Sequence, residues 1–302
     1  MIRYVERKVL DIEKYNACID SAVQNNVAGF SWYLDMVTTH WDVLVLGDYA
    51  AVMPIPWKKK YGIKYVTTPF WVLQLGVFSE NTSIEIAPFL AILFSKYSFV
   101  NLRMNTENNV LIGENTQQNQ CQVLQLDPVY SNIFKGYRKD RKKELVKAEK
   151  AFFKENWKDT PEKLIALFQE NIGSRVKNIR KKDYVILLQL LQVCIAKNKG
   201  KVLTVYDEDA RLIAAGFFLT QQTTCTILLS ATDVENRQRG AASFLIDRAI
   251  AACKKQVTAF NFGGSSIKGI ADYNTSFGAV SKEYTVLKHN RLPGVLKFFK
   301  QA

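Results

Sequence analysis

The stretch ILLSATDVENRQRGAASFLIDRAIAAC, residues 227–253, decides how this chain is understood. A strand runs into a polar loop, and the loop opens a helix. The loop contains the pattern Arg237-x-x-Gly240-x-Ala242, which places small residues at the entrance of the helix. The first N–H groups of a helix have no partner within it, and the helix dipole adds positive potential. The pattern therefore predicts a phosphate-binding loop, the alternative being an ordinary exposed junction between strand and helix.

The elements around this stretch predict an α/β (α+β) fold. In the second half two helices precede a strand pair and a third strand, after which a helix, a strand, a second helix and a last strand follow. An antiparallel meander followed by crossovers fits mixed, largely antiparallel sheets flanked by helices. The expected helices cover residues 160–173, 181–200, 238–255 and 267–279, and the expected strands cover 201–220 as a pair, 225–231, 258–264 and 283–288.

The first half of the chain shows a shorter version of the same order. We expect a strand at 2–6, a helix at 11–27, strands within 42–78, a helix at 84–97 and a strand at 99–104. The polar residues 107–122 read as a loop. We therefore predict two tandem domains, 1–128 and 129–302. No repeat is visible at the level of residues, so this prediction rests on the order of elements.

Composition narrows the classes of protein. The chain has 302 residues, of which 48% are hydrophobic, enough for two folded domains. Its five cysteines include no C-x-x-C pair, and its two histidines, His40 and His289, are far apart. These counts argue against a disulfide framework, a Cys/His metal site and a Ser-His-Asp or Cys-His hydrolase. The charged first ten residues and the short apolar runs favour a cytoplasmic protein without a transmembrane segment.

Positive charge is concentrated in the second half. Residues 1–130 carry a net charge of −2 and residues 131–302 carry +15. A single long helix is expected over residues 130–150, with eight Lys and Arg. On it, Arg138, Arg141 and Lys142 would share one face, because residues three and four apart are neighbours. Such a patch predicts an anionic partner, whether a nucleotide-bearing substrate, an RNA or a lipid surface; the alternative is a solvated basic helix.

Three segments together resemble a known superfamily. The R-x-x-G-x-A loop is similar to the coenzyme A pyrophosphate loop of the GNAT N-acyltransferases. The segment from Phe260 to Pro293, FNFGGSSIKGIADYNTSFGAVSKEYTVLKHNRLP, resembles the FemAB branch of tandem GNAT-like proteins, as does the basic segment RKDRKKELVKAEK at 138–150. The chain departs from the usual patterns in two ways. Tyr273 precedes Gly278 by five residues rather than four, and no long helical hairpin that would grip tRNA is visible.

The resemblance implies transfer of an acyl or aminoacyl group from an activated donor to an amine acceptor. Acyl-CoA, such as acetyl-CoA, is the first donor it implies, with no metal. The alternatives are an aminoacyl-tRNA-dependent FemAB-type transferase of cell-wall peptide synthesis, and a non-catalytic protein that binds a nucleotide or RNA. The first domain would then be a degenerate GNAT-like domain.

Candidate residues follow from these readings. Tyr273 is either a general acid for the leaving group or a core residue, and Asp233 or Glu235 could deprotonate the amine. The expected donor-binding residues are Arg237, Arg239, Gly240, Ala241 and Ala242. The expected substrate-binding residues are Gly263, Gly264, Arg138, Arg141 and Lys142.

Overall fold

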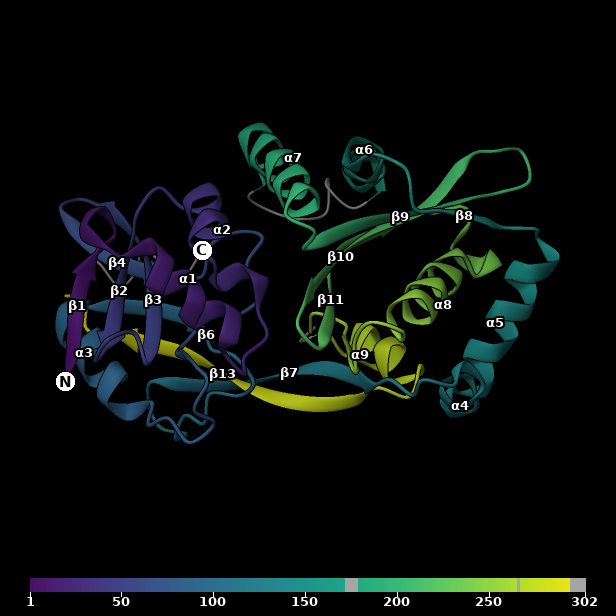
Figure 1. The fold of residues 1–302 in the computed structure, drawn as a ribbon. Coiled ribbons are helices and arrows are strands. Elements are labelled where there is room, and N and C mark those ends of the chain that lie inside the picture. Colours follow the sequence, from purple (N-terminus) through teal and green to yellow (C-terminus); the bar gives the residue numbers. More distant parts are fainter. Residues whose placement is uncertain (172–178, 265–266, 294–302) are drawn as a thin grey trace. The chain divides into compact units, whose positions relative to one another are not determined.

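The computed structural model describes residues 1–171, 179–264 and 267–293 (Figure 1). The chain forms two compact units. Unit 1 comprises Met1–Gln120 together with the segment that begins at Glu283, and unit 2 comprises Cys121–Lys282. The division falls at residue 120 rather than at the predicted residue 128, because Val123, Leu124 and Gln125 pair with a strand of unit 2. The last strand returns to unit 1.

Unit 1 is built on a mixed sheet. Strands β1 to β4 form an antiparallel meander, β4 pairs with β6 in parallel, and β6 pairs with β13 antiparallel. The short strand β5 adds to β3. The elements are β1 (Ile2–Glu6), α1 (Ile12–Ser21), α2 (Ser31–Val37), β2 (Trp41–Leu46), β3 (Ala51–Lys60), β4 (Ile63–Thr67), β5 (Phe78–Ser79), α3 (Ala87–Lys96), β6 (Phe99–Arg103), the start of β7 (Thr116–Gln125) and most of β13 (Val280–Asn290).

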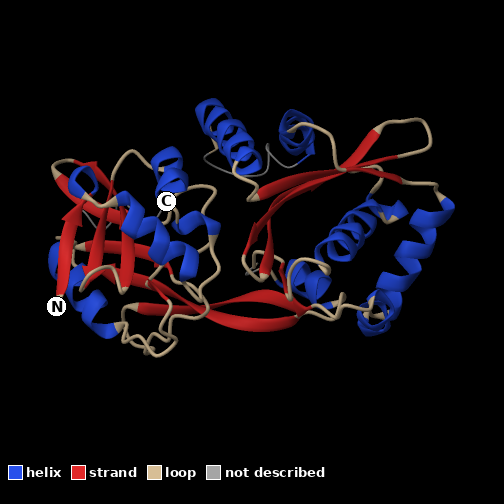
Figure 2. Cartoon of the chain, viewed as in Figure 1, coloured by secondary structure: helices blue, strands red, loops and turns tan. Residues whose placement is uncertain are grey.

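Unit 2 has the same kind of sheet (Figure 2). Strands β8 to β11 form an antiparallel meander, and β11 pairs with β12 in parallel. Helices α6 and α8 both pack against β9, β10 and β11. The elements are α4 (Tyr130–Gly136), α5 (Lys139–Lys150), β8 (Lys154–Asn156), α6 (Pro161–Asn171), α7 (Lys181–Ala196), β9 (Gly200–Tyr206), β10 (Leu212–Gln221), β11 (Thr224–Thr232), α8 (Ala241–Cys253), β12 (Ala259–Asn261) and α9 (Lys268–Thr275).

The two units repeat one order of elements. Unit 1 runs β1-α1-α2-β2-β3-β4-α3-β6 and unit 2 runs β8-α6-α7-β9-β10-β11-α8-β12, with β5 inserted in unit 1. The strand pairing is also the same, three antiparallel pairs followed by one parallel pair. The predicted fold class, two tandem units with mixed, largely antiparallel sheets flanked by helices, is confirmed.

Two sequence predictions about elements are wrong. The expected helix over residues 130–150 is broken into α4 and α5, because Tyr137 and Arg138 are extended. The Arg138 N–H donates to the Ser276 carbonyl at 2.8 Å, and the buried Tyr137 hydroxyl donates to Asp247 at 3.1 Å. The Arg138 bond replaces one that a continuous helix would form within itself, and the Tyr137 bond ties the break to α8. The expected loop at 107–122 contains the beginning of β7, whose exposed polar side chains hide its strand character.

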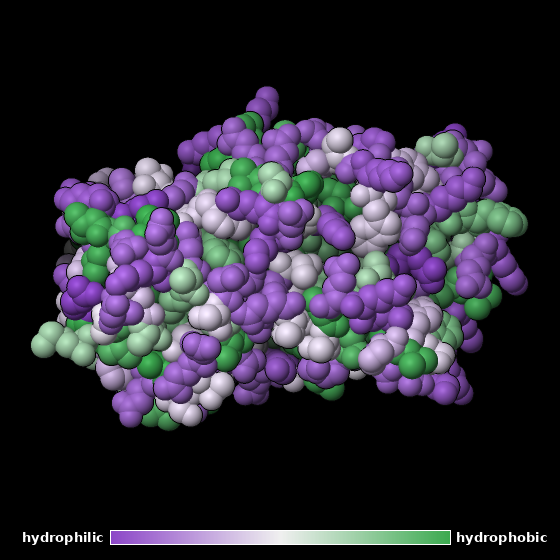
Figure 3. All heavy atoms as spheres, viewed as in Figure 1, coloured by the Kyte–Doolittle hydropathy of each residue, from purple (hydrophilic) through white to green (hydrophobic). Residues whose placement is uncertain are grey.

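The helices of the described chain include no membrane-spanning segment. None of the helices in residues 1–171, 179–264 and 267–293 combines the length and apolarity that crossing a bilayer requires. On the face drawn in Figure 3, hydrophilic side chains predominate and hydrophobic ones lie in small patches between them. The same described residues hold no group of three or more His, Cys, Asp or Glu that could bind a metal ion.

His289 on β13 is a buried polar residue of unit 1. Its ring is 1% exposed and stacks on Phe94 of α3, with ring centroids 4.5 Å apart. Within the described residues neither ring nitrogen has a hydrogen-bond partner. Burial, with a smaller contribution from the Arg291 charge, lowers the pKa of His289 below its ordinary value. The folded state therefore prefers the neutral ring.

This preference predicts how stability depends on pH. Since the unfolded ring has a pKa near 6.5, the stabilisation is complete above about pH 6.5 and is lost as the pH falls through and below that value. We expect His289→Phe to flatten the fall in unfolding free energy between pH 7 and 5. We also expect it to stabilise the fold at pH 7, since a buried unsatisfied polar group costs about 1–3 kcal/mol. Urea denaturation across this pH range measures both effects.

His40 provides the matched control, because the chain has only two histidines and His40 is exposed. His40→Gln should leave the fall between pH 7 and 5 in place. Loss of the pH dependence in His40→Gln, or its survival in His289→Phe, would contradict the assignment.

Candidate active site

The site predicted from the sequence lies at the parallel strand pair of unit 2. Strands β11 and β12 pair only over Thr224–Thr226 and Ala259–Asn261, after which β11 continues to Thr232. In open α/β sheets, ligands gather where the carboxyl ends of neighbouring strands part. From this place β11 leads to α8 and β12 leads to α9.

Gly240 stands immediately before α8, as predicted, with φ of +86°. A Cβ at this position would lie 2.5 Å from the carbonyl oxygen of Glu144 on α5. Gly240 thus serves a left-handed turn and a close approach, but the group that approaches is the backbone of α5. At the N-terminal turn of α8, Gly240 and Ala241 are buried, and Ala242 is partly exposed.

A polar network joins α5, α8 and α9 at this place. Arg141, only 4% exposed, donates to Glu144 and to Ser243, and its Nε donates to the Ser276 hydroxyl at 2.9 Å. The Ser243 hydroxyl donates to Glu144 at 2.5 Å. The same hydroxyl lies 3.3 Å from the Tyr273 hydroxyl. The Arg141 charge is thus paired inside the unit, as a buried charge requires.

Aromatic rings fill the space beneath this network. Phe262 lies 5.1 Å from Phe260 and 5.8 Å from Phe277, measured between ring centroids. Tyr273 lies 5.4 Å from Phe277, and the Arg141 guanidinium sits 4.3 Å above the Tyr273 ring. The Arg141 guanidinium and these aromatic rings therefore pack together inside unit 2.

The Tyr273 hydroxyl is held in its protonated form. Burial is the main cause that raises its pKa to about 12, while the Ser243 bond and the Arg141 charge oppose the rise. At neutral pH the phenol can therefore donate a proton and cannot act as a base. The sequence left two roles open for Tyr273, a general acid or a core residue. The position of Tyr273 in the Arg141 network is compatible with both roles.

An open pocket lies beside the start of α8. It is lined by Lys147, Lys150, Ala151, Glu208, Gln238 and Arg239, and its volume is about 360 Å³. Three of these side chains are cations. The carboxylate, Glu208, reaches Arg239 only at 3.7 Å, and both side chains are well exposed. A net positive pocket next to Gly240 is suited to phosphate oxygens.

The residues of the predicted donor loop lie partly at the basic pocket and partly in the first turn of α8. Arg239 lines the basic pocket, and Arg237 is exposed. Ala241 is buried under α5, and Ala242 is partly exposed at the first turn of α8. Gly240 thus precedes a helix as predicted, while the donor-binding role of the loop stays a prediction.

The predicted carboxylates do not join the Tyr273 network. Asp233 accepts a hydrogen bond from the Asn236 side chain at 2.7 Å within the turn after β11. Glu235 is exposed in the same turn. Across the described ranges, no hydrogen bond or ion pair connects either residue to Tyr273.

The predicted basic patch of α5 is not a single surface. Arg141 points into the unit, on the same helix face as the buried Leu145 and Ala148. Arg138 precedes the helix and pairs with Asp140 at 2.6 Å, which lowers the pKa of that carboxyl to about 2. Lys142 donates to the Lys135 carbonyl at 2.9 Å. The prediction of a shared face for Arg138, Arg141 and Lys142 is therefore wrong, because helical spacing does not say which face packs inward.

Gly263 and Gly264 follow β12, with φ of +79° and +81°. Two successive left-handed residues make a tight turn that other residues adopt at a cost, and the substrate-binding role predicted for the pair stays a prediction. The Gly263 N–H donates to the Asn261 side chain at 2.9 Å.

Sequence reasoning missed four residues of this region. Ser243 and Glu144 complete the network around Arg141, and Lys147 and Lys150 line the basic pocket. The spacing of Arg141 and Glu144, three residues apart, was a usable signal for a pair on one helix. The spacing alone did not tell that the pair would be buried against another helix.

Residues 135–274 match the family model of the acetyltransferase (GNAT) domain. This span lies wholly within unit 2, so unit 2 is a GNAT domain. A comparison with curated protein sequences finds no match.

Solved structures extend the likeness to the whole chain. The structure of FemX is similar with a TM-score of 0.68 and 10% identity, over 99% of this chain and 100% of that chain. The structure of L-PGS from Bacillus licheniformis has a TM-score of 0.58 and 15% identity, over 95% of each chain. A tandem GNAT protein from the clavulanic acid biosynthesis pathway has a TM-score of 0.51 and 9% identity, over 95% and 97% of the two chains. Residues 135–274 thus match a GNAT domain, and the chain as a whole has a FemAB-like, tandem GNAT-like fold.

Proposed function

We propose that this protein is an N-acyltransferase that moves an acyl or aminoacyl group from a phosphate-bearing carrier to an amine. The observation that carries the proposal is the basic pocket of Lys147, Lys150 and Arg239 at the start of α8, inside the GNAT domain. Acyl-CoA and aminoacyl-tRNA share the chemistry that this pocket would recognise, an activated acyl group on a nucleotide with phosphates.

In this proposal the basic pocket binds the phosphates of the carrier in place of the start of α8. The backbone of α5 occupies the space over Gly240, so a pyrophosphate cannot lie against Gly240 itself unless α5 moves. Lys147 and Lys150 belong to α5 itself, and Arg239 precedes Gly240. Three cations just outside the covered turn would hold the same anion by charge and hydrogen bonds.

Tyr273 would supply the proton to the leaving group. Attack by the amine expels either a thiolate, from a thioester, or an alkoxide, from an ester. A thiol has a pKa near 8.5, so a thiolate leaves without needing a proton from a phenol whose pKa is about 12. An alkoxide is much more basic and gains from a positioned acid. The pKa of Tyr273 therefore suits an ester donor better than a thioester.

Two features favour an aminoacyl-tRNA ester as the alternative donor. They are the backbone of α5 over Gly240 and the high pKa of Tyr273. Acyl-CoA remains the donor that GNAT domains imply. The acceptor amine would be deprotonated by solvent or substrate, or by Asp233 or Glu235 after a change in the turn that carries them.

Isothermal titration with acetyl-CoA and, separately, with deacylated tRNA tests the proposal. We expect the variant Lys147→Gln/Lys150→Gln/Arg239→Gln to weaken binding of the true carrier at least 10-fold. Its affinity should also depend less steeply on salt, because fewer phosphate contacts remain.

The control removes three charges elsewhere in unit 2. Lys139, Lys143 and Lys154 are exposed and do not line the pocket, so changing all three to Gln alters the net charge equally. Equal weakening in both triple variants would reduce the pocket to a nonspecific charge effect. Failure of the wild-type protein to bind either carrier would refute the proposal.

A further inference from the structure

A polar pocket lies where the parallel strands of unit 1 part. Strands β4 and β6 pair at Val66–Val100 and Thr67–Asn101, and the chain then leaves the sheet. It returns at Leu75, which bridges to Met104. A pocket of about 310 Å³ lies at this separation. Because the two units repeat one order of strands, the pair β4 and β6 of unit 1 corresponds to the pair β11 and β12 of unit 2.

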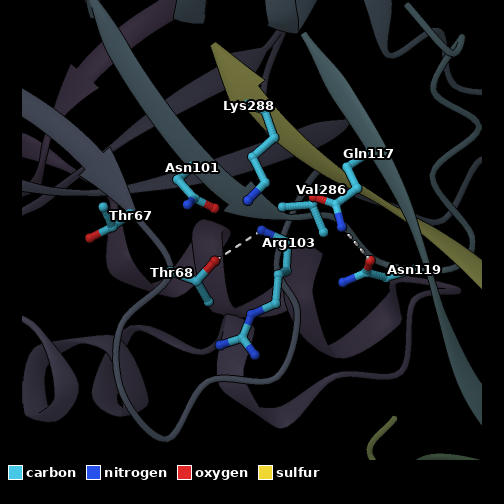
Figure 4. Close-up of a pocket in the computed structure, with 8 residues that line it drawn as sticks. All are labelled: Thr67, Thr68, Asn101, Arg103, Gln117, Asn119, Val286 and Lys288. Atoms are coloured by element: carbon cyan, nitrogen blue, oxygen red, sulfur yellow. Dashed lines mark hydrogen bonds between the residues drawn. The ribbon is translucent and has the colours of Figure 1, made fainter. Parts of the chain in front are cut away.

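The pocket is lined by polar side chains from four strands and the turn after β4 (Figure 4). On β6, Asn101 and Arg103 share a face because they are two residues apart, while Leu102 between them is buried. On β13, Lys288 stands opposite Asn101, and Val286 stands opposite Arg103. The lining residues are Thr67, Thr68, Asn101, Arg103, Gln117, Asn119, Val286 and Lys288.

The lining is cationic and has no anion of its own. It contains one Arg and one Lys, three amides and two hydroxyls, and neither Asp nor Glu. Burial lowers the pKa of Arg103, so its charge is held at a cost. Within residues 1–171, 179–264 and 267–293, no carboxylate forms an ion pair with Arg103 or Lys288. The guanidinium instead donates to the Val72 carbonyl at 2.7 Å.

The side chains are arranged around the space rather than bonded across it. In Figure 4 the Lys288 side chain extends toward Asn101, and the Arg103 guanidinium points away from Lys288. The Arg103 backbone N–H donates to the Thr68 hydroxyl at 2.9 Å, which fixes the turn after β4. The Gln117 side chain donates to Asn119 at 3.1 Å on β7. Cations at two sides of a polar hollow can hold an anion and hydroxyl groups together.

We propose that this pocket binds a small polyhydroxylated anion, of the class of the sugar phosphates. A phosphate monoester carries about −1.5 to −2 charge at pH 7, which would balance Arg103 and Lys288. Amides and hydroxyls would exchange hydrogen bonds with a sugar ring. No aromatic ring is among the lining residues, so the pocket offers no platform on which a base would stack. Its volume is at the lower end of the range for small-molecule sites, about 300–1,000 Å³.

Titration of the full chain with glucose 6-phosphate, gluconate, glucose and inorganic phosphate tests the proposal without any acyl donor. We expect glucose 6-phosphate to bind at least 10-fold more tightly than glucose or inorganic phosphate, because it engages the cations and the amides at once. Tighter binding of gluconate would change the class to hydroxycarboxylates and overturn the assignment of a phosphate. Binding of inorganic phosphate as tight as that of the sugar phosphate would overturn the role of the amides.

Two variants connect the binding to the pocket. Lys288→Gln removes an exposed charge and should weaken glucose 6-phosphate at least 10-fold with an unchanged melting temperature. Arg103→Lys keeps the charge but loses the planar guanidinium, and it should weaken the binding of glucose 6-phosphate as well. The control is Lys59→Gln, an exposed lysine on β3 that does not line the pocket. Unchanged binding in Lys288→Gln, or an equal loss in Lys59→Gln, would refute the site.

The outcome of the glucose 6-phosphate titration does not depend on the proposed transferase activity. The lining belongs entirely to unit 1, whereas the residues proposed for the donor belong to unit 2. Binding of glucose 6-phosphate can therefore succeed when the carrier titration fails, and the reverse.

Discussion

Gly240→Ala should lower the free energy of unfolding of unit 2 by about 2–5 kcal/mol. The new Cβ would require a left-handed backbone from alanine, which costs about 1–2 kcal/mol. It would also lie 2.5 Å from the Glu144 carbonyl oxygen, where no flexible side chain can move aside. Forcing α5 away from α8 adds about 1–3 kcal/mol, the usual cost of overpacking. Denaturant unfolding followed by circular dichroism measures the loss.

Gly136→Ala is the matched control. No atom lies within 4 Å of a Cβ built at Gly136, and its backbone conformation is an ordinary one. Gly136→Ala should raise the free energy of unfolding by less than about 1 kcal/mol, because alanine has a higher helix propensity than glycine. A Gly240→Ala protein as stable as the wild type would mean that α5 does not cover the start of α8, and the helix end would return as a phosphate site.

Tyr273→Phe should lower kcat roughly 100-fold or more with an ester donor, since general acid catalysis contributes about 10²–10⁴. The KM for the donor should change little, because the ring and its packing against Phe277 survive. With a thioester donor the loss should be much smaller, because the thiolate needs no proton from a group of pKa about 12. Steady-state rates with both donors, on the same preparation, give the comparison.

Tyr137→Phe separates this effect from general damage. The Tyr137 hydroxyl donates to the buried Asp247, so its loss should reduce stability while the folded enzyme turns over normally. If Tyr273→Phe instead lowers the melting temperature and leaves kcat intact, Tyr273 is a core residue. A large fall in kcat with the thioester alone would contradict the link between its pKa and the leaving group.

Much of the architecture is readable from the sequence because it is encoded locally. The strand, loop and helix at 227–253 follow from apolar patterning and from glycine at the helix entrance. The order of elements is also local, so it predicted the tandem fold even without a repeat in the residues. Gly240 was expected at the start of a helix, and it is there.

What the sequence by itself determined about this protein is thus the order and type of most of its elements and the resemblance of its second half to a GNAT domain. Only the tertiary structure decided which of its basic side chains are open. Arg141 and Lys142 are neighbours in the sequence, yet Arg141 is buried under α8 and α9 while Lys142 faces the Lys135 carbonyl. In unit 2 Arg141 packs on the Tyr273 ring, whereas in unit 1 Arg103 and Lys288 line an open polar pocket. The reason is physical: local patterns fix the backbone element, but burial and charge pairing depend on residues more than a hundred positions away, such as Ser243 and Ser276 for Arg141.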